Sequence, residues 1–266
     1  MSFQLHRGTA PLLVSMPHVG TEIPAGLRDR YVPRALAVED TDWHLAQLYA
    51  CVADLGGSML QPRLSRYVID LNRPPDDAPM YPGASNTELC PTRFFTGDPL
   101  YAADRAPDRD EQRWRRAEYW QPYHDALQGE LERLRAEHGF VLLWDGHSIR
   151  SEIPWLFEGV LPDLNIGSGG GTSADPSITE AVAAVAAGCK EGTHAVNGRF
   201  KGGYITRHYG KPAAHVHAVQ LEMTQKLYMS ESPPYAYLPE RAGRIQPVLR
   251  EMVAAALRAT QALYGR

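Results

Sequence analysis

Val141-Leu-Leu-Trp-Asp-Gly-His-Ser148 is an apolar run that passes directly into the polar residues Asp145, His147 and Ser148. The apolar half is typical of a buried strand, and the polar side chains after it have no obvious packing role. In α/β sheets, ligands and chemistry gather at the carboxyl ends of strands. We therefore expect Phe140–Trp144 to be the central strand and the polar residues that follow it to belong to a functional site.

A second segment has the same form. Leu12–Ser15 is apolar and is soon followed by His18. Two strand-end histidines favour a metal site, because imidazole nitrogens are common zinc ligands and a carboxylate with a water would complete the set. Three nearby side chains could supply the remaining ligand, namely Asp42, His44 and Glu22.

Segments with strand and helix patterns alternate along the chain. Helices are expected over Thr41–Leu55, Arg109–His138, Ser177–Ala187 and Arg241–Tyr264, and further strands over Ser58–Gln61, Tyr67–Leu71 and Val216–Glu222. From Asn72 to about Asp104 the chain is rich in Pro, Gly, Asn and Asp, which indicates a long loop. The alternation predicts an α/β fold with a mixed, largely parallel sheet flanked by helices. A length of 266 residues suits one domain that covers residues 1–266.

The composition argues against several kinds of partner. A net charge of −4 and a pI near 6.2 give no electrostatic reason to bind nucleic acid or an anionic membrane. No apolar stretch approaches the roughly 18–20 residues that span a bilayer, and the first residues lack a signal-peptide pattern. The cysteines number three and are widely spaced, which is typical of reduced thiols. We expect a cytoplasmic protein with neither a nucleic-acid nor a membrane partner.

Polar residues also end two other predicted strands. Asn72 and Arg73 follow Tyr67–Leu71, and Glu222 ends a strand of apolar neighbours. Burying Glu222 would be costly unless it had a function or a partner. An arginine is a forked donor for a carboxylate or an oxyanion, so Arg73 either contacts a substrate or forms a surface ion pair. Arg66 allows the same two interpretations.

Several motifs together resemble a known family. Asp70-Leu-Asn-Arg73, Asp145-Gly-His-Ser148 and Leu221-Glu222 resemble signatures of zinc carboxypeptidase-like hydrolases. Each motif is weak by itself, but their order along the chain, from about His18 to Tyr228, is that of one group. The resemblance narrows to the N-formylglutamate amidohydrolase family on Met16-Pro-His-Val-Gly20, Asp40-Thr-Asp-Trp-His44, Ser65-Arg-Tyr-Val-Ile-Asp-Leu-Asn-Arg-Pro-Pro75, Pro122-Tyr-His124, Phe200-Lys-Gly-Gly-Tyr-Ile-Thr206 and Gln220-Leu-Glu222.

This resemblance implies a zinc-exopeptidase-like fold and the hydrolysis of N-formyl-L-glutamate to formate and L-glutamate in histidine degradation. It implies Zn²⁺, or another divalent metal, held by His18, Asp42 and His147, with Glu222 as the general base. The carboxypeptidase pattern His-x-x-Glu is not kept, since Glu22 lies one residue late. Asp42, from the Asp-Thr-Asp-Trp motif, is therefore preferred to Glu22 as the carboxylate ligand.

The resemblance also implies how a small N-formyl amino acid substrate is bound. Asn72 and Arg73 match the pair that grips its free carboxylate, and Arg66, Gly203 and Thr206 are further expected contacts, the last two from a loop. Two alternatives remain open. One is a metallohydrolase of another N-acyl amino acid or a small peptide, and the other is an inactive metal-binding or amino-acid-binding protein. The physiological metal and the oligomeric state also stay open.

Overall fold

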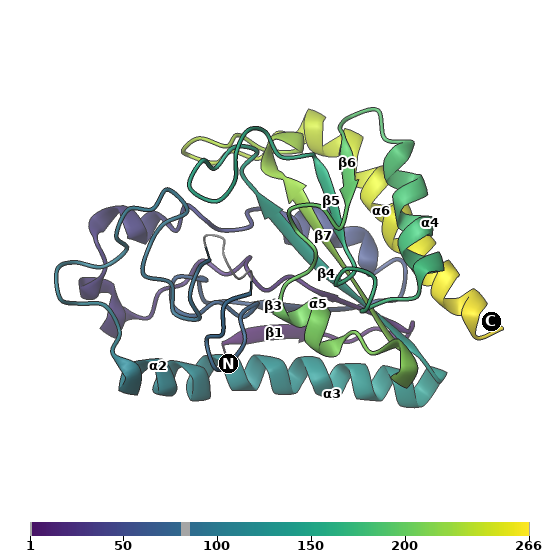
Figure 1. The fold of residues 1–266 in the computed structure, drawn as a ribbon, viewed down its shortest axis with the longest axis horizontal. Coiled ribbons are helices and arrows are strands. Elements are labelled where there is room, and N and C mark those ends of the chain that lie inside the picture. The colour runs from purple at the N-terminus through teal and green to yellow at the C-terminus, as the bar shows by residue number, and fades with distance from the viewer. Residues whose placement is uncertain (1, 81–85, 266) are drawn as a thin grey trace.

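A seven-stranded sheet forms the centre of the computed structural model, which describes residues 2–80 and 86–265 (Figure 1). The strand order is β1-β3-β2-β4-β7-β5-β6. The pairs β2–β3, β2–β4, β4–β7 and β5–β6 are parallel, whereas β1–β3 and β5–β7 are antiparallel. The strands are β1 (Phe3–His6), β2 (Leu12–Ser15), β3 (Ser58–Pro62), β4 (Val141–Ile149), β5 (Leu164–Gly167), β6 (His194–Val196) and β7 (Val216–Thr224). The expected α/β class with a mixed, largely parallel sheet is confirmed.

Helices cover both faces of this sheet. In Figure 1, α3 runs beneath the sheet, and α4 and α6 lie together on its other side. A π-helical turn over Arg116–Trp120 joins α2 to α3, so the long helix expected here is nearly continuous. The helices are α1 (Leu45–Leu48), α2 (Arg109–Arg115), α3 (Gln121–His138), α4 (Pro176–Ala187), α5 (Tyr204–Tyr209) and α6 (Pro239–Leu263).

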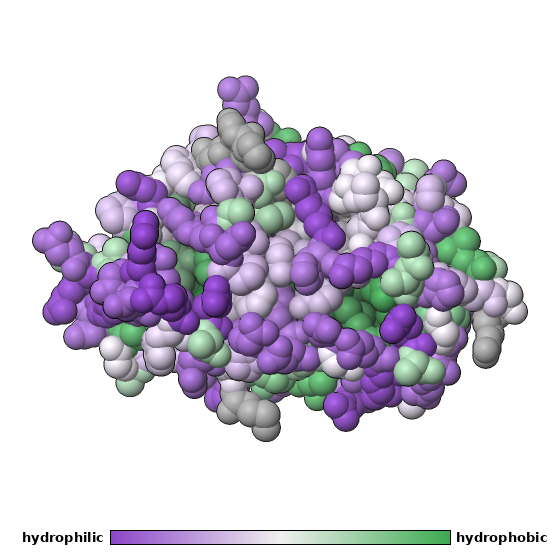
Figure 2. Space-filling model, turned by 60° about the horizontal axis from the view of Figure 1, so that its bottom comes forward, coloured by the Kyte–Doolittle hydropathy of each residue, from purple (hydrophilic) through white to green (hydrophobic). Residues whose placement is uncertain are grey.

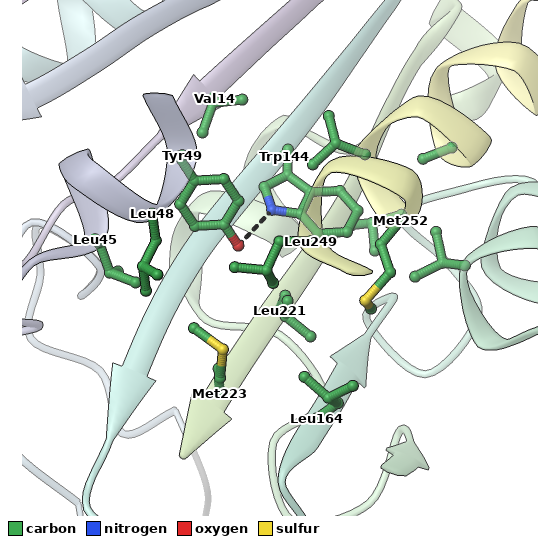
Figure 3. Close-up of a cluster of buried hydrophobic side chains, with 14 of the residues drawn as sticks. Val14, Leu45, Leu48, Tyr49, Trp144, Leu164, Leu221, Met223, Leu249 and Met252 are labelled. Carbon is green, nitrogen blue, oxygen red and sulfur yellow. Dashed lines mark hydrogen bonds between the residues drawn. The ribbon is translucent and has the colours of Figure 1, made fainter. Parts of the chain in front are cut away.

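Side chains that alternate along β4 divide the core into two parts. Leu142 and Trp144 pack with α1, α4 and α6, whereas Leu143 faces the cluster formed with α3 and α5. Figure 3 shows Trp144 among side chains of β7 and α6, with its Nε1 donating to the hydroxyl of Tyr49 at 3.0 Å. Gly146 lies on this same face, where a Cβ atom would be 3.1 Å from the Tyr49 ring. Glycine therefore lets the ring pack directly against the strand.

The strand that carries the polar segment is longer than the sequence indicates. β4 continues through Ile149, so Asp145 and His147 lie within the strand rather than beyond it. Glu222 likewise lies within β7. β2 ends at Ser15, which is paired with Asp145, and the later residues of β4 pair only with β7. The second halves of β4 and β7 thus project past β2 and carry the polar residues together.

Other expectations about the elements were wrong. The helix expected over Thr41–Leu55 is reduced to α1 and a 3₁₀ turn at Tyr49–Val52, because His44 has a φ of 62°, a left-handed conformation that no helix continues through. Tyr67–Leu71 forms turns instead of a strand. The short elements β1, β5, β6 and α5 were not expected, since so few residues leave no clear periodicity. The long loop after Asn72 contains no named helix or strand in its described part, and residues 81–85 lie outside the described residues.

The surface is largely polar. Figure 2 shows one face of the molecule, which is mostly hydrophilic with hydrophobic residues in scattered patches. In the described part of the chain, the exposed large hydrophobic side chains are far apart in sequence, at Leu36, Trp114, Val160, Val196 and Leu263. Among the described residues, no helix is both long enough and apolar enough to cross a membrane.

Candidate metal centre and substrate cavity

His18, Asp42 and His147 come together from three separate segments. His18 follows β2, Asp42 precedes α1 and His147 lies in β4. All three are buried, and one ligand atom of each lies within 4.8 Å of the other two. Oδ2 of Asp42 is 3.3 Å from Nδ1 of His147 and 3.8 Å from Nδ1 of His18. Imidazole nitrogens and a carboxylate oxygen form a ligand set that suits zinc, so these residues could hold a divalent metal ion.

Two further carboxylates orient the histidine rings. Nε2 of His18 is 2.7 Å from Oδ1 of Asp70, and Nε2 of His147 is 3.1 Å from Oδ1 of Asp145. Within residues 2–80 and 86–265, this Asp145 oxygen has no other polar partner. A proton on Nε2 of His18 leaves its Nδ1 with a lone pair toward Asp42. Metal-binding histidines are commonly fixed in this way by a carboxylate on the opposite nitrogen, so the donor set fits a metal ion.

The charges around the two histidines differ. Burial by itself lowers the pKa of His147, but the carboxylates of Asp145 and Asp42 raise that pKa well above its ordinary value. Burial lowers the pKa of His18, and the nearby guanidinium of Arg66 lowers it further. The cluster is therefore most negative on the side of His147, where a cation is favoured.

Helix α5 fixes Asp145 from the other side. The hydroxyl of Thr206 donates to Oδ2 of Asp145 at 3.0 Å, and Thr206 is fully buried. Thr206 thus lies in α5 rather than in a loop, and its hydroxyl is hydrogen-bonded to Asp145; its contact with substrate stays a prediction. Gly203, which precedes α5, does line the cavity. A Cβ atom on Gly203 would lie 2.3 Å from Nδ2 of Asn72, so a larger residue would displace that amide.

Asn72 lies between the cluster and the cavity. Its Nδ2 is 3.0 Å from Nε2 of His147, and its Oδ1 accepts the backbone N–H of Ile205 at 2.8 Å. Its own backbone N–H donates to Oδ1 of Asp70 at 2.9 Å. Asn72 also lines the cavity, although much of its amide group is already hydrogen-bonded within the protein.

Glu222 is paired directly with His147 across the β4–β7 ladder. Its side chain is buried and lines the cavity, and in the described part of the chain its carboxyl group has no hydrogen-bond partner. Burial raises the pKa of Glu222 to about 8, with His147 opposing this shift and Asp42 adding to it. A carboxyl group placed in this way can exchange a proton with a molecule in the cavity.

His18, His147 and Glu222 form part of the wall of a cavity. Arg66 and Arg73 also line it, together with a third arginine, Arg199. The remaining wall is partly apolar and comes from Phe95, Ile149, Leu156 and Phe200, with polar groups of Asn72, Asn86, Thr87, Ser148, Gly203 and Gln220. A cavity lined by three arginines suits a small anionic ligand.

Arg66 and Arg73 are held in different ways. Nη2 of Arg66 donates to Oδ2 of Asp70 at 2.7 Å, and the guanidinium lies over the ring of Phe95. Nε and Nη2 of Arg73 donate to the carbonyl and hydroxyl of Thr87, and Nη1 donates to the carbonyl of residue 72. The charge of Arg66 is thus balanced by a direct carboxylate partner. Arg73 lies 3.9 Å from that same carboxylate, and it is a preorganised donor in the cavity wall rather than a surface ion pair.

The alternative ligands lie elsewhere. Glu22 pairs with Arg63 at 2.8 Å, and both side chains are about half exposed, at 52% and 51%. Nε2 of His44 is 2.8 Å from the carbonyl of Tyr235. Neither residue belongs to the cluster, in which Asp42 is the carboxylate.

Several residues of the site were missed from sequence. Asp70 belongs to the Asp-Leu-Asn-Arg motif, but an acid between Ile69 and Leu71 in an apolar run is also a local signal of a functional role. The sequence signal for Arg199 is only its place just before the Phe200-Lys-Gly-Gly203 segment. Phe95 and Leu156 belong to loops whose packing no periodicity reveals.

The fold and the site together indicate the class of protein. An α/β sheet that carries a buried His-Asp-His cluster, a buried glutamate and an arginine-lined cavity is the arrangement of a hydrolase with a candidate metal centre. A crystal structure of N-formylglutamate amidohydrolase from Ralstonia eutropha JMP134 has this fold, with a TM-score of 0.82 at 26% identity over 99% of this chain and 98% of that one. A gene product of Agrobacterium tumefaciens, 20% identical, shares the fold with a TM-score of 0.71 over 97% of this chain and 95% of that one. The peptidase-like fold implied by the resemblance is confirmed.

Sequence relatives then identify the family. The family model described as N-formylglutamate amidohydrolase matches residues 10–229. N-formylglutamate deformylase of Pseudomonas putida is 49% identical over 252 residues, covering 95% of this chain and 94% of that protein. The protein of the same name from Pseudomonas aeruginosa is 49% identical over 247 residues, covering 93% and 92%. This chain belongs to the N-formylglutamate amidohydrolase family.

Proposed function

We propose that this protein hydrolyses N-formyl-L-glutamate to formate and L-glutamate with a zinc ion held by His18, Asp42 and His147, as a step of histidine degradation. The observation that carries the proposal is the position of this buried cluster beside Glu222 in an arginine-lined cavity. The names of relatives that are 49% identical over nearly the whole chain support the substrate.

A divalent ion at the cluster would supply Lewis acidity, which polarises the formyl carbonyl and makes water at the site more acidic. Glu222 accepts a proton from the attacking water while the water oxygen bonds to the formyl carbon. Glu222 then returns that proton to the amide nitrogen, the carbon–nitrogen bond breaks, and formate and the free amine of glutamate leave. The absence of a competing hydrogen-bond partner among the described residues supports this role for Glu222.

Arg73 binds a substrate carboxylate. The contacts of its guanidinium with Thr87 and the carbonyl of residue 72 hold its fork in place before the ligand arrives, which reduces the entropy lost on binding. Asn72 and Gly203 shape the adjoining wall, and Arg66 adds positive charge. Asp70 and Asp145 keep both histidine rings oriented toward Asp42.

Release of formate tests the proposal. The protein is stripped of metal with a chelator, and formate is measured after one divalent cation at a time is restored. We expect no activity without metal, recovery with zinc, and faster hydrolysis of N-formyl-L-glutamate than of N-acetyl-L-glutamate. Comparable hydrolysis of acetylated substrates or small peptides would point to a broader N-acyl hydrolase. Binding of N-formyl-L-glutamate without formate release under any cation would point to a binding protein.

A further inference from the structure

We infer that Arg199 binds the side-chain carboxylate of the substrate and makes the cavity selective for dicarboxylates. This inference rests on the proposed function and deepens it. N-formylglutamate carries two carboxylates, and placing both in a partly enclosed cavity is costly unless each meets a cation or several donors. Arg66 lies against the candidate metal centre, hydrogen-bonded to Asp70 and 3.9 Å from Oδ1 of Asp42. Arg73 and Arg199 are the other two arginines of the wall.

Arg199 reaches the cavity from a different part of the chain than Arg73. It lies between β6 and α5, and its Nη2 donates to the carbonyl of Leu156 at 3.1 Å. Its guanidinium carbon is 5.3 Å from the centre of the Phe200 ring. Leu156 and Phe200 also line the cavity, so Arg199 is anchored to an apolar part of the wall. That surface suits the methylene groups that separate the two carboxylates of glutamate.

The position of the metal cluster decides which carboxylate each arginine takes. Nη1 of Arg73 is 3.9 Å from Oδ2 of Asp70, whose Oδ1 holds the ring of His18. Arg73 is thus one side chain away from a candidate metal ligand. The contacts of Arg199 with Leu156 and Phe200 lie on segments that contribute nothing to the cluster. In the substrate, the α-carboxylate is close to the formyl amide and the side-chain carboxylate is farther along. Arg73 therefore takes the α-carboxylate and Arg199 the side-chain carboxylate.

The test compares N-formyl-L-glutamate with N-formyl-L-glutamine, which has nearly the same shape and lacks the second charge. We expect Arg199→Met to lower kcat/KM for N-formyl-L-glutamate by roughly 10- to 100-fold, mainly through KM, since a hydrogen-bonded ion pair is lost. Hydrolysis of N-formyl-L-glutamine should change little, and this also shows that the variant is folded. Arg199→Lys should recover part of the preference, because it keeps the charge without the fork. Arg73→Met should impair both substrates.

Lys201→Met is the matched control, because Lys201 is an exposed cation on the same segment and does not line the cavity. We expect its preference for glutamate over glutamine to equal that of the unmodified protein. An unchanged preference in Arg199→Met, or an equal loss on both substrates, would overturn the assignment of Arg199.

Binding of glutarate separates this inference from the proposed reaction. Glutarate keeps both carboxylates of glutamate and has no amide to hydrolyse, so calorimetry on the zinc-loaded protein reports binding alone. We expect glutarate to bind more tightly than its monoamide, and Arg199→Met to abolish the difference. If formate release fails while this difference is seen and is lost in Arg199→Met, the reaction is wrong and the carboxylate site stands. If glutarate does not bind, the assignment of Arg199 is wrong whatever the reaction.

Discussion

At the scale of single residues, the candidate site depends on which nitrogen of each histidine is free. Asp70 and Asp145 face the Nε2 atoms of His18 and His147, and Oδ2 of Asp42 faces both Nδ1 atoms. The hydrogen bond to Asp70 fixes the tautomer and the orientation of the His18 ring, and the contacts of Nε2 of His147 with Asp145 and Asn72 hold the second ring. Ligand replacements should therefore remove metal without disturbing the sheet that supports the rings.

Replacing the proposed ligands tests the cluster. We expect His18→Ala, Asp42→Ala and His147→Ala each to lose bound zinc and formate release together, while circular dichroism shows an intact fold. Glu22→Ala is the control, because Glu22 pairs with Arg63 at the surface and should keep full zinc content. Elemental analysis of the purified variants measures the metal. A fully loaded His147→Ala protein would remove His147 from the ligand set.

Glu222→Gln tests the proposed acid–base residue. Because Glu222 is proposed to move protons and not to hold the metal, the variant should keep zinc and substrate binding. Its turnover should fall by roughly two to four orders of magnitude, the usual contribution of a positioned general acid–base. Stopped-time formate assays and calorimetry with N-formyl-L-glutamate measure the two properties. A variant that loses its zinc would show that Glu222 is a ligand instead.

At the scale of elements, β4 has two different halves on one strand. Its first half is apolar on both faces, and its second half carries Asp145 and His147 toward the site while Gly146 faces Tyr49. The hydrogen bond from Trp144 to Tyr49 ties the strand to the turn that follows α1 (Figure 3). That turn lies shortly after Asp42, so the packing of β4 also supports the loop that carries the carboxylate ligand.

Tyr49→Phe tests this connection. It leaves the buried Nε1 of Trp144 without a partner, and we expect a loss of about 1–3 kcal/mol in the free energy of unfolding from the desolvated N–H. In a Trp144→Phe background the same change should cost less, because no donor remains to be stranded. Denaturant unfolding of the four proteins gives the coupling energy. Equal costs in both backgrounds would mean that the hydrogen bond contributes nothing.

At the scale of the whole molecule, a buried histidine links α3 to the site. Nε2 of His124 is 2.9 Å from the carbonyl of Leu71, the residue before Asn72, and Nδ1 is 2.9 Å from the hydroxyl of Tyr209. Burial lowers the pKa of His124 to about 3, with His208 adding to the effect. An unfolded chain with an ordinary histidine pKa of about 6.5 therefore binds more protons than the folded protein between these values. The stability that the neutral His124 ring contributes is fully present above pH 6.5 and decreases as the pH falls from 6.5 toward 3.

This difference predicts acid sensitivity of the fold. Between pH 7 and pH 5, the protonation of His124 in the unfolded chain should cost about 2 kcal/mol of stability. The glutamine side chain of a His124→Gln variant offers an N–H and a carbonyl oxygen but does not titrate. Between pH 7 and pH 5, the variant should therefore lose about 2 kcal/mol less stability than the unmodified protein. Denaturant midpoints of the metal-free proteins, kept in chelator, measure both. An equal fall in the two proteins would show that His124 is not responsible.

The local sequence determined those features of this protein that depend only on residues near one another along the chain. Alternation of apolar segments predicted the α/β sheet, and polar residues at the ends of such segments predicted that His18, His147 and Glu222 lie in its site. The family motifs supplied the preference for Asp42. These features can be predicted from sequence because apolar and polar side chains repeat with the period of the strand or helix that carries them.

Only the tertiary structure placed the residues whose surroundings come from distant segments. In the structure, Glu22 lies at the surface and Thr206 is buried against Asp145. Arg199 lines the cavity, and β4 extends past the end of β2. None of these follows from spacing along the chain, because each depends on contacts between segments far apart in sequence. Burial and hydrogen-bond partners decide what a polar side chain can still do, and they are set only when the segments pack together.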